Sequence, residues 1–136
     1  MTQQQPEKFL GTRPNTVMEV LGIEITEAEI GRVVATMPVD ERHHQPRGIV
    51  HGGVNVVLAE TVASIGAYLA VDHATEYVVG VEINANHIRA VRSGTLTATG
   101  VALHQGRRTA VWQVEIRNSE GKLTCVSRCT LAVVQL

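Results

Sequence analysis

The sequence predicts an α+β fold in which a curved antiparallel sheet wraps around one long central helix. Residues 53–71 are apolar on nearly every side, which is typical of a helix that is buried all round rather than on one face. The segments on both sides of it alternate between apolar and polar residues and are separated by turn residues, as strands are. A helix without a polar face needs an enclosing surface, and a strongly curved sheet provides one.

Before the long helix, the sequence predicts a short helix, a pair of strands and a loop. Asn15 or Thr16 is expected to cap the short helix and Gly22 to end it, because these residue types favour those positions. The expected elements are a loose polar lead-in over residues 1–12, the short helix over 15–21, two strands within 23–38 around a turn near Glu29–Gly31, and a loop over 39–50.

The long helix and the strands after it follow from length and alternation. Valine is frequent within residues 53–71, so a strand competes with the helix there, but the run is too long for one ordinary strand. Turn residues then separate four strand-like segments. These cover residues 77–91, 95–106, 108–117 and 122–134.

Composition and charge limit the classes of function. The 136 residues are expected to form one domain over 1–136, and a 44% hydrophobic content provides for a core. The formal net charge of −1 gives no global attraction to nucleic acid or to an anionic membrane. The most apolar stretch, residues 54–71, is a poor membrane span because it contains Asn55, Glu60 and Ser64.

Cysteine usage and the N-terminus indicate a reducing compartment. The first residues are polar and lack the apolar segment of a secretory signal. Cys125 and Cys129 are four residues apart in a strand-like run, so they are expected to lie ~13 Å apart, too far for a disulfide. Both are expected to be small packing residues rather than nucleophiles. The sequence therefore predicts a cytoplasmic protein.

Glu60 is the first candidate for chemistry. It is the only formally charged residue between His51 and Asp72, and its neighbours are apolar. An unpaired carboxylate is costly to bury, so it needs a partner or a task. Ser64 and Tyr68 follow at four and eight residues, which places them on the same helix face as a polar stripe. A structural carboxylate that bonds to backbone or to a partner subunit is the competing explanation.

The start of the long helix is the second candidate. His51 stands directly before Gly52 and Gly53, and glycine lets a backbone N–H approach a ligand closely. A helix N-terminus adds unpaired N–H groups and the positive end of the dipole, which can polarise a carbonyl and hold an oxyanion. Gln45, six residues before His51, can donate a hydrogen bond or position a water. The His-Gly-Gly triplet alone is a weak signal, since it also fits an ordinary turn.

These residues together resemble the active-site pattern of hotdog thioesterases of the 4-hydroxybenzoyl-CoA type, in the branch whose Glu lies on the helix. They are Gln45, His51, Gly52, Glu60 and Ser64. The resemblance extends from about Met18 to Val134. Three stretches look especially similar to the 1,4-dihydroxy-2-naphthoyl-CoA thioesterases and to their paralogue that proofreads enterobactin assembly. They are residues 35–60, 78–94 and 104–128.

The resemblance implies a hotdog fold, thioester hydrolysis and a site shared between two subunits. Glu60 would be the nucleophile or general base, and the Gly52 N–H would polarise the thioester carbonyl. Gln45 would position the carbonyl or the water, and His51 would orient the loop. Ser64 would hydrogen-bond Glu60 or the water. Glu60 would then face Gly52 of the other chain, in a homodimer or homotetramer.

A CoA tail needs hydrogen-bond donors and positive charge. His87 and Arg89 are expected to share one face of a strand by alternation. Solvated surface charge is the competing explanation, and the family resemblance favours contacts with CoA. The candidates are His87, Arg89 and Arg92 in one segment, and His104, Gly106, Arg107 and Arg108 at another strand junction.

The leading hypothesis is an acyl-CoA thioesterase for an aromatic acyl group, with 1,4-dihydroxy-2-naphthoyl-CoA as the first choice. Benzoyl-CoA, phenylacetyl-CoA and an aryl group on an acyl carrier protein are the alternatives. An enoyl-CoA hydratase pairs an Asp with a His in an arrangement that is not found here. A non-catalytic acyl-CoA-binding module would not need Glu60. No cofactor is expected apart from the CoA of the substrate, and no Cys/His/Asp spacing indicates a metal site.

Overall fold

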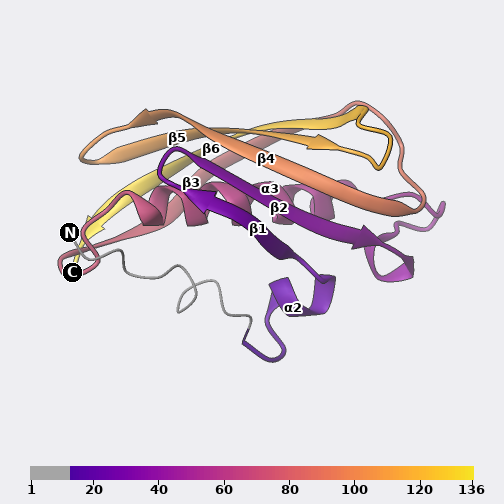
Figure 1. The fold of residues 1–136 in the computed structure, drawn as a ribbon, viewed down its shortest axis with the longest axis horizontal. Helices are drawn as coiled ribbons and strands as arrows, with labels where there is room; N and C mark the ends of the chain where they lie inside the picture. Colours follow the sequence, from indigo (N-terminus) through magenta and orange to yellow (C-terminus); the bar gives the residue numbers. More distant parts are fainter. Residues whose placement is uncertain (1–12) are drawn as a thin grey trace.

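The computed structural model describes residues 13–136, so the lead-in expected over residues 1–12 lies outside the described residues. The helices and strands follow one another in the predicted order, except that a short 3-10 helix lies within the loop expected over residues 39–50 (Figure 1). They are α2 (Val17–Leu21), β1 (Glu24–Glu29), β2 (Arg32–Val39), the 3-10 helix η1 (Glu41–His43), α3 (Gly52–Leu69), β3 (Glu76–His87), β4 (Gly94–Gln105), β5 (Thr109–Arg117) and β6 (Leu123–Gln135).

The strands form one antiparallel six-stranded sheet in the order β1-β2-β4-β5-β6-β3. The helix α3 lies against the inner face of the curved sheet and contacts each of the six strands (Figure 1). It also connects β2 near one side of the sheet to β3 at the opposite edge. The predicted hotdog arrangement, a long helix enclosed by a curved antiparallel sheet, is confirmed.

Small residues allow α3 to pack close to the sheet. A Cβ atom on Gly66 would lie 2.2 Å from Cη2 of Trp112, and one on Gly100 of β4 would lie 2.5 Å from Val62. Trp112 is fully buried in a core that is otherwise mainly Val, Ile, Leu and Ala. By length and composition α3 could cross a membrane, but in this fold it is the core helix, with one face packed against the sheet.

The short helix α2 ends where the sequence predicts but begins at Val17, two residues after the expected start, and the Thr16 side chain makes no capping hydrogen bond. Thr16 is its N-cap residue, and Gly22 ends it with a φ of 69° in the left-handed region that glycine adopts easily. The strands β1 and β2 then meet at a turn that contains Gly31, also with a positive φ of 90°. Both elements follow from local residue preferences.

The strand β3 is shorter than predicted. It ends at His87, whereas alternation predicted a strand through residue 91. The N–H groups of Ile88 and Arg89 both donate to the carbonyl of Thr124, at 2.8 and 3.3 Å, and the regular ladder with β6 stops there. The expectation that His87 and Arg89 share one strand face is therefore wrong, because Arg89 lies beyond the end of the strand.

Candidate active site

The first turn of α3 leaves one backbone N–H free. His51 caps the helix, because its Nδ1 accepts the Gly53 N–H at 2.8 Å. The His51 carbonyl accepts the N–H groups of Val54 and Asn55 at 2.9 and 3.4 Å. None of the described residues supplies an acceptor for the Gly52 N–H. This amide, at the positive end of the helix, is therefore available to a carbonyl oxygen.

A tight loop before the helix holds Gln45. Its backbone N–H donates to the Ile49 carbonyl at 2.8 Å, and its own carbonyl accepts the Gly48 N–H at 2.9 Å. Its side-chain Oε1 accepts the backbone N–H of Arg47. Within residues 13–136 the side-chain NH2 group has no acceptor, so this end of the half-buried amide can donate to a ligand.

Glu60 lies two turns further along α3, with its carboxylate against β3. A Cβ atom on Gly80 would lie 2.4 Å from Oε1 of Glu60, so glycine at this position makes room for the carboxylate. The pairing of β3 with β6 shifts between Gly80 and Glu82, beside the same group. No hydrogen bond or ion pair within the described part of the chain involves the Glu60 carboxylate.

The polar stripe on α3 is present, but it is only half-buried. Glu60, Ser64 and Tyr68 are all partly exposed, whereas the sequence predicted a fully buried carboxylate. The reason is that β3, which Glu60 contacts, is an edge strand with no neighbour on its outer side. At the end of the stripe, His73 stacks on the Tyr68 ring at 3.9 Å and donates from Nε2 to the Tyr68 carbonyl at 2.7 Å.

The residues that carry the free N–H and the carboxylate lie well apart along α3. Gly52 and Glu60 are eight residues apart on the same helix, which is ~12 Å along its axis at ~1.5 Å per residue. A reacting carbonyl has to lie within about 3.5 Å of both groups. The two groups therefore belong to separate points of α3 within one chain.

The profile of the thioesterase superfamily matches residues 47–125, a segment that includes His51, Gly52 and Glu60. The chain belongs to the thioesterase superfamily.

Individual relatives agree with this family assignment. The 1,4-dihydroxy-2-naphthoyl-CoA hydrolases of Listeria monocytogenes and Escherichia coli are each 49% identical to this thioesterase, over 86% and 74% of its chain and 94% and 73% of theirs. The solved thioesterase HI1161 of Haemophilus influenzae matches with a TM-score of 0.90 and 46% identity, covering 97% of this chain and 92% of that one. A mutant thioesterase of Pseudomonas aeruginosa gives a TM-score of 0.93 and 42% identity, covering 98% and 96%. The protein is thus a thioester hydrolase.

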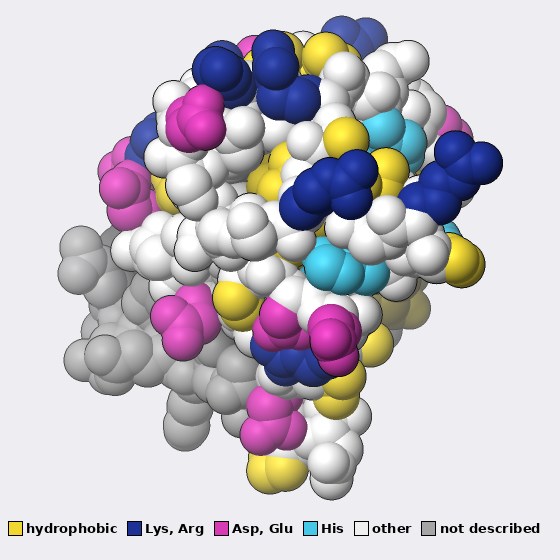
Figure 2. Space-filling model, turned by 90° about the vertical axis from the view of Figure 1, so that its right-hand side faces the viewer, with side chains coloured by type: hydrophobic (Ala, Val, Ile, Leu, Met, Phe, Trp, Pro, Cys, Tyr) yellow, Lys and Arg dark blue, Asp and Glu magenta, His cyan; other side chains and the backbone are white. Residues whose placement is uncertain are grey.

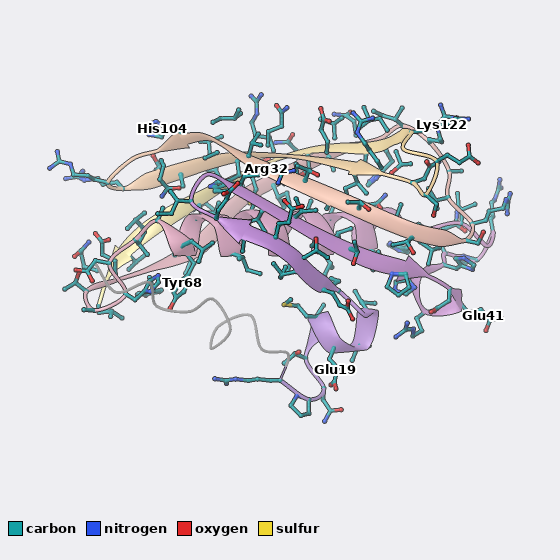
Figure 3. The ribbon with its side chains drawn as sticks, viewed as in Figure 1. Glu19, Arg32, Glu41, Tyr68, His104 and Lys122 are labelled. Atoms are coloured by element: carbon teal, nitrogen blue, oxygen red, sulfur yellow. The ribbon has the colours of Figure 1, made fainter. Side chains whose placement is uncertain are left out.

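The candidate CoA contacts of this thioesterase lie in two separate places. His87 ends β3 beside the first turn of α3, and Arg89 follows it. In the register of the sheet, the β4–β5 hairpin lies opposite Gly80 of β3. Gly80 is seven residues from His87, so the hairpin and His87 are ~23 Å apart along the strand direction. Figure 3 shows His104 near one end of the sheet. The hairpin group consists of His104, Gly106, Arg107 and Arg108.

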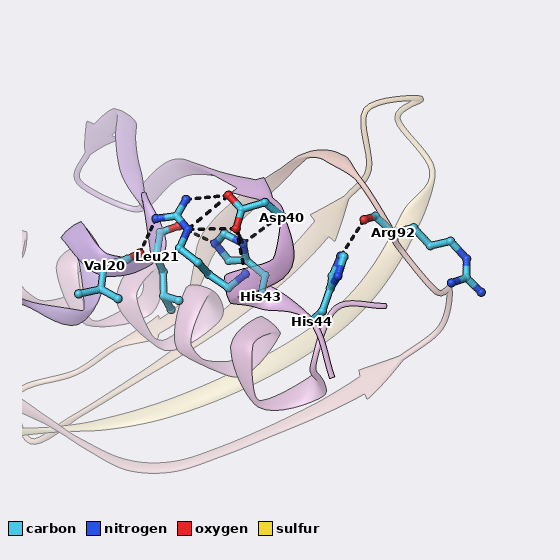
Figure 4. Close-up of polar contacts among 7 residues, drawn as sticks. Val20, Leu21, Asp40, His43, His44 and Arg92 are labelled. Carbon is cyan, nitrogen blue, oxygen red and sulfur yellow. Dashed lines mark hydrogen bonds and ion pairs between the residues drawn. The ribbon is translucent and has the colours of Figure 1, made fainter. Parts of the chain in front are cut away.

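Basic and histidine side chains gather at the end of the molecule that carries the start of α3 (Figure 2). Arg92, in the segment after β3, contacts the loop before α3. Its guanidinium donates to the Arg47 carbonyl at 3.3 Å, and its own carbonyl accepts from Nε2 of His44 at 2.8 Å (Figure 4). The loop that holds Gln45 is thereby tied to the segment that follows β3.

A buried histidine that the sequence did not predict supports the site. The polar segment around His43 predicts an exposed loop, but the side chain is fully buried. Its Nδ1 accepts the Asp40 N–H at 3.1 Å, and its Nε2 donates to the Leu21 carbonyl at 2.7 Å (Figure 4). Its carbonyl accepts the His51 N–H at 2.8 Å, so it holds the residue that caps α3. The signal was a capping box in which His43 stands three residues after Asp40.

The ion pair of Asp40 with Arg42 and the two buried thiols have shifted pKa values. The Arg42 guanidinium, hydrogen-bonded to the Asp40 carboxylate, holds the pKa of that carboxyl well below its usual range. Burial raises the pKa of the Cys125 and Cys129 thiols to about 11, and the charge of Glu60 adds to the shift of Cys129. Both thiols are free and fully buried on β6, so the prediction that they are packing residues is confirmed. Within residues 13–136 no group of three or more His, Cys, Asp or Glu side chains is placed to hold a metal ion.

Proposed function

We propose that this thioesterase hydrolyses an aromatic acyl-CoA at a site shared by two protomers. The observation that carries the proposal is a pair of groups on α3 that have no hydrogen-bond partner among the described residues, the Gly52 N–H and the Glu60 carboxylate. The N–H polarises the thioester carbonyl, and the carboxylate activates water or attacks directly. Because ~12 Å of helix separates the two groups in one chain, Glu60 of one protomer serves the carbonyl bound at Gly52 of the other.

The reaction starts when the Gly52 N–H donates to the carbonyl oxygen. Glu60 takes a proton from a water molecule as the water oxygen attacks the carbonyl carbon. The tetrahedral oxyanion, held by the same N–H, collapses and breaks the C–S bond, and the leaving CoA thiolate takes the proton from Glu60. Direct attack by Glu60, giving a mixed anhydride that water hydrolyses, uses the same two groups and is the alternative route.

The other residues of the pattern have supporting roles in this proposal. Gln45 uses its free NH2 group to hold the carbonyl or the water. His51 keeps the glycine turn in shape, because its imidazole accepts the Gly53 N–H. Ser64, one turn after Glu60 on the same face of α3, hydrogen-bonds the carboxylate or the water.

An exposed edge strand supports the pairing of two protomers. The strand β3 is at the edge of the sheet beside Glu60, and its apolar Tyr77, Val79 and Val81 are 40%, 42% and 64% exposed. An open strand edge with apolar side chains favours association with a second chain. We therefore propose a homodimer, or a homotetramer made of two such dimers.

The acyl-CoA assignment rests on charge and on the relatives. The CoA phosphates suit the exposed Arg89 near the start of α3 and the exposed Arg107 and Arg108 of the hairpin. The names of the Listeria monocytogenes and Escherichia coli relatives support 1,4-dihydroxy-2-naphthoyl-CoA as the substrate. Benzoyl-CoA, phenylacetyl-CoA and aryl groups on an acyl carrier protein are the alternatives. The proposed reaction needs no cofactor, and two free thiols suit the reducing cytoplasm.

Mixed dimers test the reaction and the shared site together. Gln45→Ala and Glu60→Gln are each expected to lose most activity on the best substrate of a panel of naphthoyl, benzoyl, phenylacetyl and aliphatic CoA esters. When the two inactive chains are refolded together, about half of the dimers are mixed and hold one intact site of two, so about a quarter of wild-type activity returns. A mixture as inactive as its parents contradicts the shared site. A wild-type protein that releases no thiol from any ester contradicts the proposed function.

A further inference from the structure

Asn55 is a buried polar residue whose side chain is only half satisfied. It lies in the first turns of α3 and is 6% exposed. Its Nδ2 lies 3.2 Å from Nδ1 of His87, at the end of β3. Its Oδ1 is the one buried side-chain oxygen of the described residues that has no hydrogen-bond partner. An unpaired buried carbonyl costs folding free energy, so stability alone does not explain an asparagine at this position.

The imidazole of His87 reaches from Asn55 to Gly52. A Cβ atom on Gly52 would lie 2.8 Å from Nε2 of His87, so the ring fills the space that a side chain would take. Gly52 and Asn55 are three residues apart on α3 and share one face of the helix. His87 is itself an exposed residue, so its ring is held by the Asn55 amide rather than by burial in the core.

We propose that Asn55 and His87 are positioning residues that direct the free Gly52 N–H toward the thioester carbonyl, an inference that rests on the proposed function. The Asn55 amide orients the imidazole, and the imidazole packs on the Cα of Gly52, next to the peptide that carries the free N–H. Glycine gives that peptide rotational freedom, which the ring restricts. Misplacing a reacting group by ~1 Å costs ~10²-fold in rate, so a small tilt of this peptide is sufficient to matter.

A positioning role differs in its kinetics from the contact between His87 and CoA that the family resemblance implies. A contact with the nucleotide binds the ground state and the transition state alike, so its loss raises KM and has no effect on a substrate without the nucleotide. A positioning residue acts on the carbonyl, so its loss lowers kcat on any thioester. Benzoyl-CoA and the benzoyl ester of N-acetylcysteamine separate the two cases.

The experiment compares His87→Ala, Asn55→Leu and the double variant on both esters. Each single variant is expected to lower kcat about tenfold or more on both, with little change in KM. Because Asn55 acts through His87, the double variant is expected to be no slower than His87→Ala. Leucine has a similar volume and no unpaired carbonyl, so Asn55→Leu is expected to melt at the wild-type temperature or above it.

His104→Ala, at the other end of the sheet, is the matched control and is expected to raise KM on benzoyl-CoA only. Three results would each overturn the inference. The first is a kcat of the double variant that falls by the product of the two single effects, and the second is a wild-type kcat in both single variants. The third is an effect of His87→Ala on KM that is confined to the CoA ester. A lower melting temperature of Asn55→Leu at unchanged kcat would also overturn it, because the pair would then be structural. If the inference is overturned in this way while the wild type is active and Glu60→Gln is inactive, the proposed function survives. A wild type that hydrolyses neither ester overturns both.

Discussion

Glu60 is a carboxylate that no group within residues 13–136 neutralises. A structural carboxylate would be expected to accept hydrogen bonds from backbone or side chains, yet within residues 13–136 none reaches it. Gly80 makes space for it on β3, where a side chain would collide with Oε1. A half-buried charge with space around it and no partner is free to meet a substrate, a water molecule or a second protomer.

Replacement of Glu60 by Gln separates catalysis from folding. Gln has the same size, and the part of the chain that the structure describes has no ion pair with Glu60 to break, so Glu60→Gln is expected to melt near the wild-type temperature. It cannot accept a proton from water or attack the carbonyl, so kcat is expected to fall by ~10²–10⁴-fold. The measurements are kcat on the best CoA ester and a melting curve. Activity within tenfold of wild type would refute the catalytic assignment.

The two buried thiols predict a weakness of the fold at alkaline pH. Thiols of the unfolded chain ionise near pH ~8.5, whereas those of the folded chain have a pKa of about 11. Below the lower value both states are protonated and stability does not depend on these groups. Between the two values the unfolded state loses protons that the folded state retains, so the free energy of unfolding is expected to fall as pH rises.

Denaturant titrations at pH 8 and pH 10.5 measure this effect. The control is the double variant Cys125→Ala/Cys129→Ala, which is expected to lose less stability between the two pH values than the wild type. In addition, a thiol reagent is expected to react with the wild type at pH 8 only after a denaturant is added. Rapid reaction of both thiols in the native protein would contradict their burial.

At the scale of elements, the close packing of α3 against the sheet depends on two glycines. Gly66 meets the ring of Trp112 on β5, and Gly100 on β4 meets Val62 of the helix. A Cβ atom on either glycine would lie closer to its neighbour than van der Waals contact allows. The same close approach holds Glu60 against β3, because one rigid helix carries both Gly66 and Glu60.

Gly66→Ala is expected to lower the free energy of unfolding by ~1–3 kcal/mol through overpacking against Trp112. The gain in helix propensity from alanine offsets only part of that loss. The measurement is a denaturant titration of Gly66→Ala, Trp112→Phe and the double variant. The smaller ring is expected to relieve the clash, so the double variant should be more stable than the sum of the single effects. An unchanged stability of Gly66→Ala would show that the helix can shift.

The β4–β5 hairpin provides a second test at this scale. Arg107→Ala is expected to raise KM for the CoA ester about tenfold with a smaller effect on kcat, because a phosphate contact binds ground state and transition state alike. The effect is expected to vanish on an N-acetylcysteamine ester. Arg117→Ala, an exposed arginine at the opposite end of β5, is the control and is expected to leave KM unchanged. Equal losses on both esters would exclude a nucleotide contact.

At the scale of the whole molecule, the proposed site shared by two protomers predicts that activity depends on association. The free N–H lies at one end of α3, and the carboxylate lies beside the edge strand β3. In the proposed dimer, a second chain paired along β3 supplies the other half of each site. A substitution on the edge strand β3 is therefore expected to lower activity without lowering the stability of the folded single chain.

Val81→Lys is expected to give a folded monomer without activity. Val81 is 64% exposed beside the irregular pairing of β3, and a lysine there places an unpaired charge in the proposed interface. The control is Ile30→Lys, which changes another exposed apolar residue, 78% exposed at the β1–β2 turn, and is expected to leave assembly and activity unchanged. Sedimentation velocity and thiol release measure the outcome. A fully active monomer would refute the shared site.

Local patterns in the sequence were sufficient to predict the elements and the chemical groups. The apolar run of α3 and the alternation of the strands arise from short-range periodicity, which the chain carries whatever its tertiary contacts. The same holds for Gly22 at the end of α2, where glycine adopts a positive φ. The spacing of Gly52 and Glu60 on one helix likewise sets the distance between them before any strand is placed.

Tertiary structure decided whatever depends on a contact between distant segments. The strand β3 ends at His87 because Thr124, from another strand, takes the next two N–H groups. His43 is buried because Leu21 offers it an acceptor, whereas the capping-box spacing after Asp40 indicates only its local hydrogen bond. The contact of His87 with Gly52 exists only because β3 returns to the start of α3. Periodicity and residue type are local properties of a chain, whereas burial and hydrogen-bond partners are set by which remote segments the fold brings together.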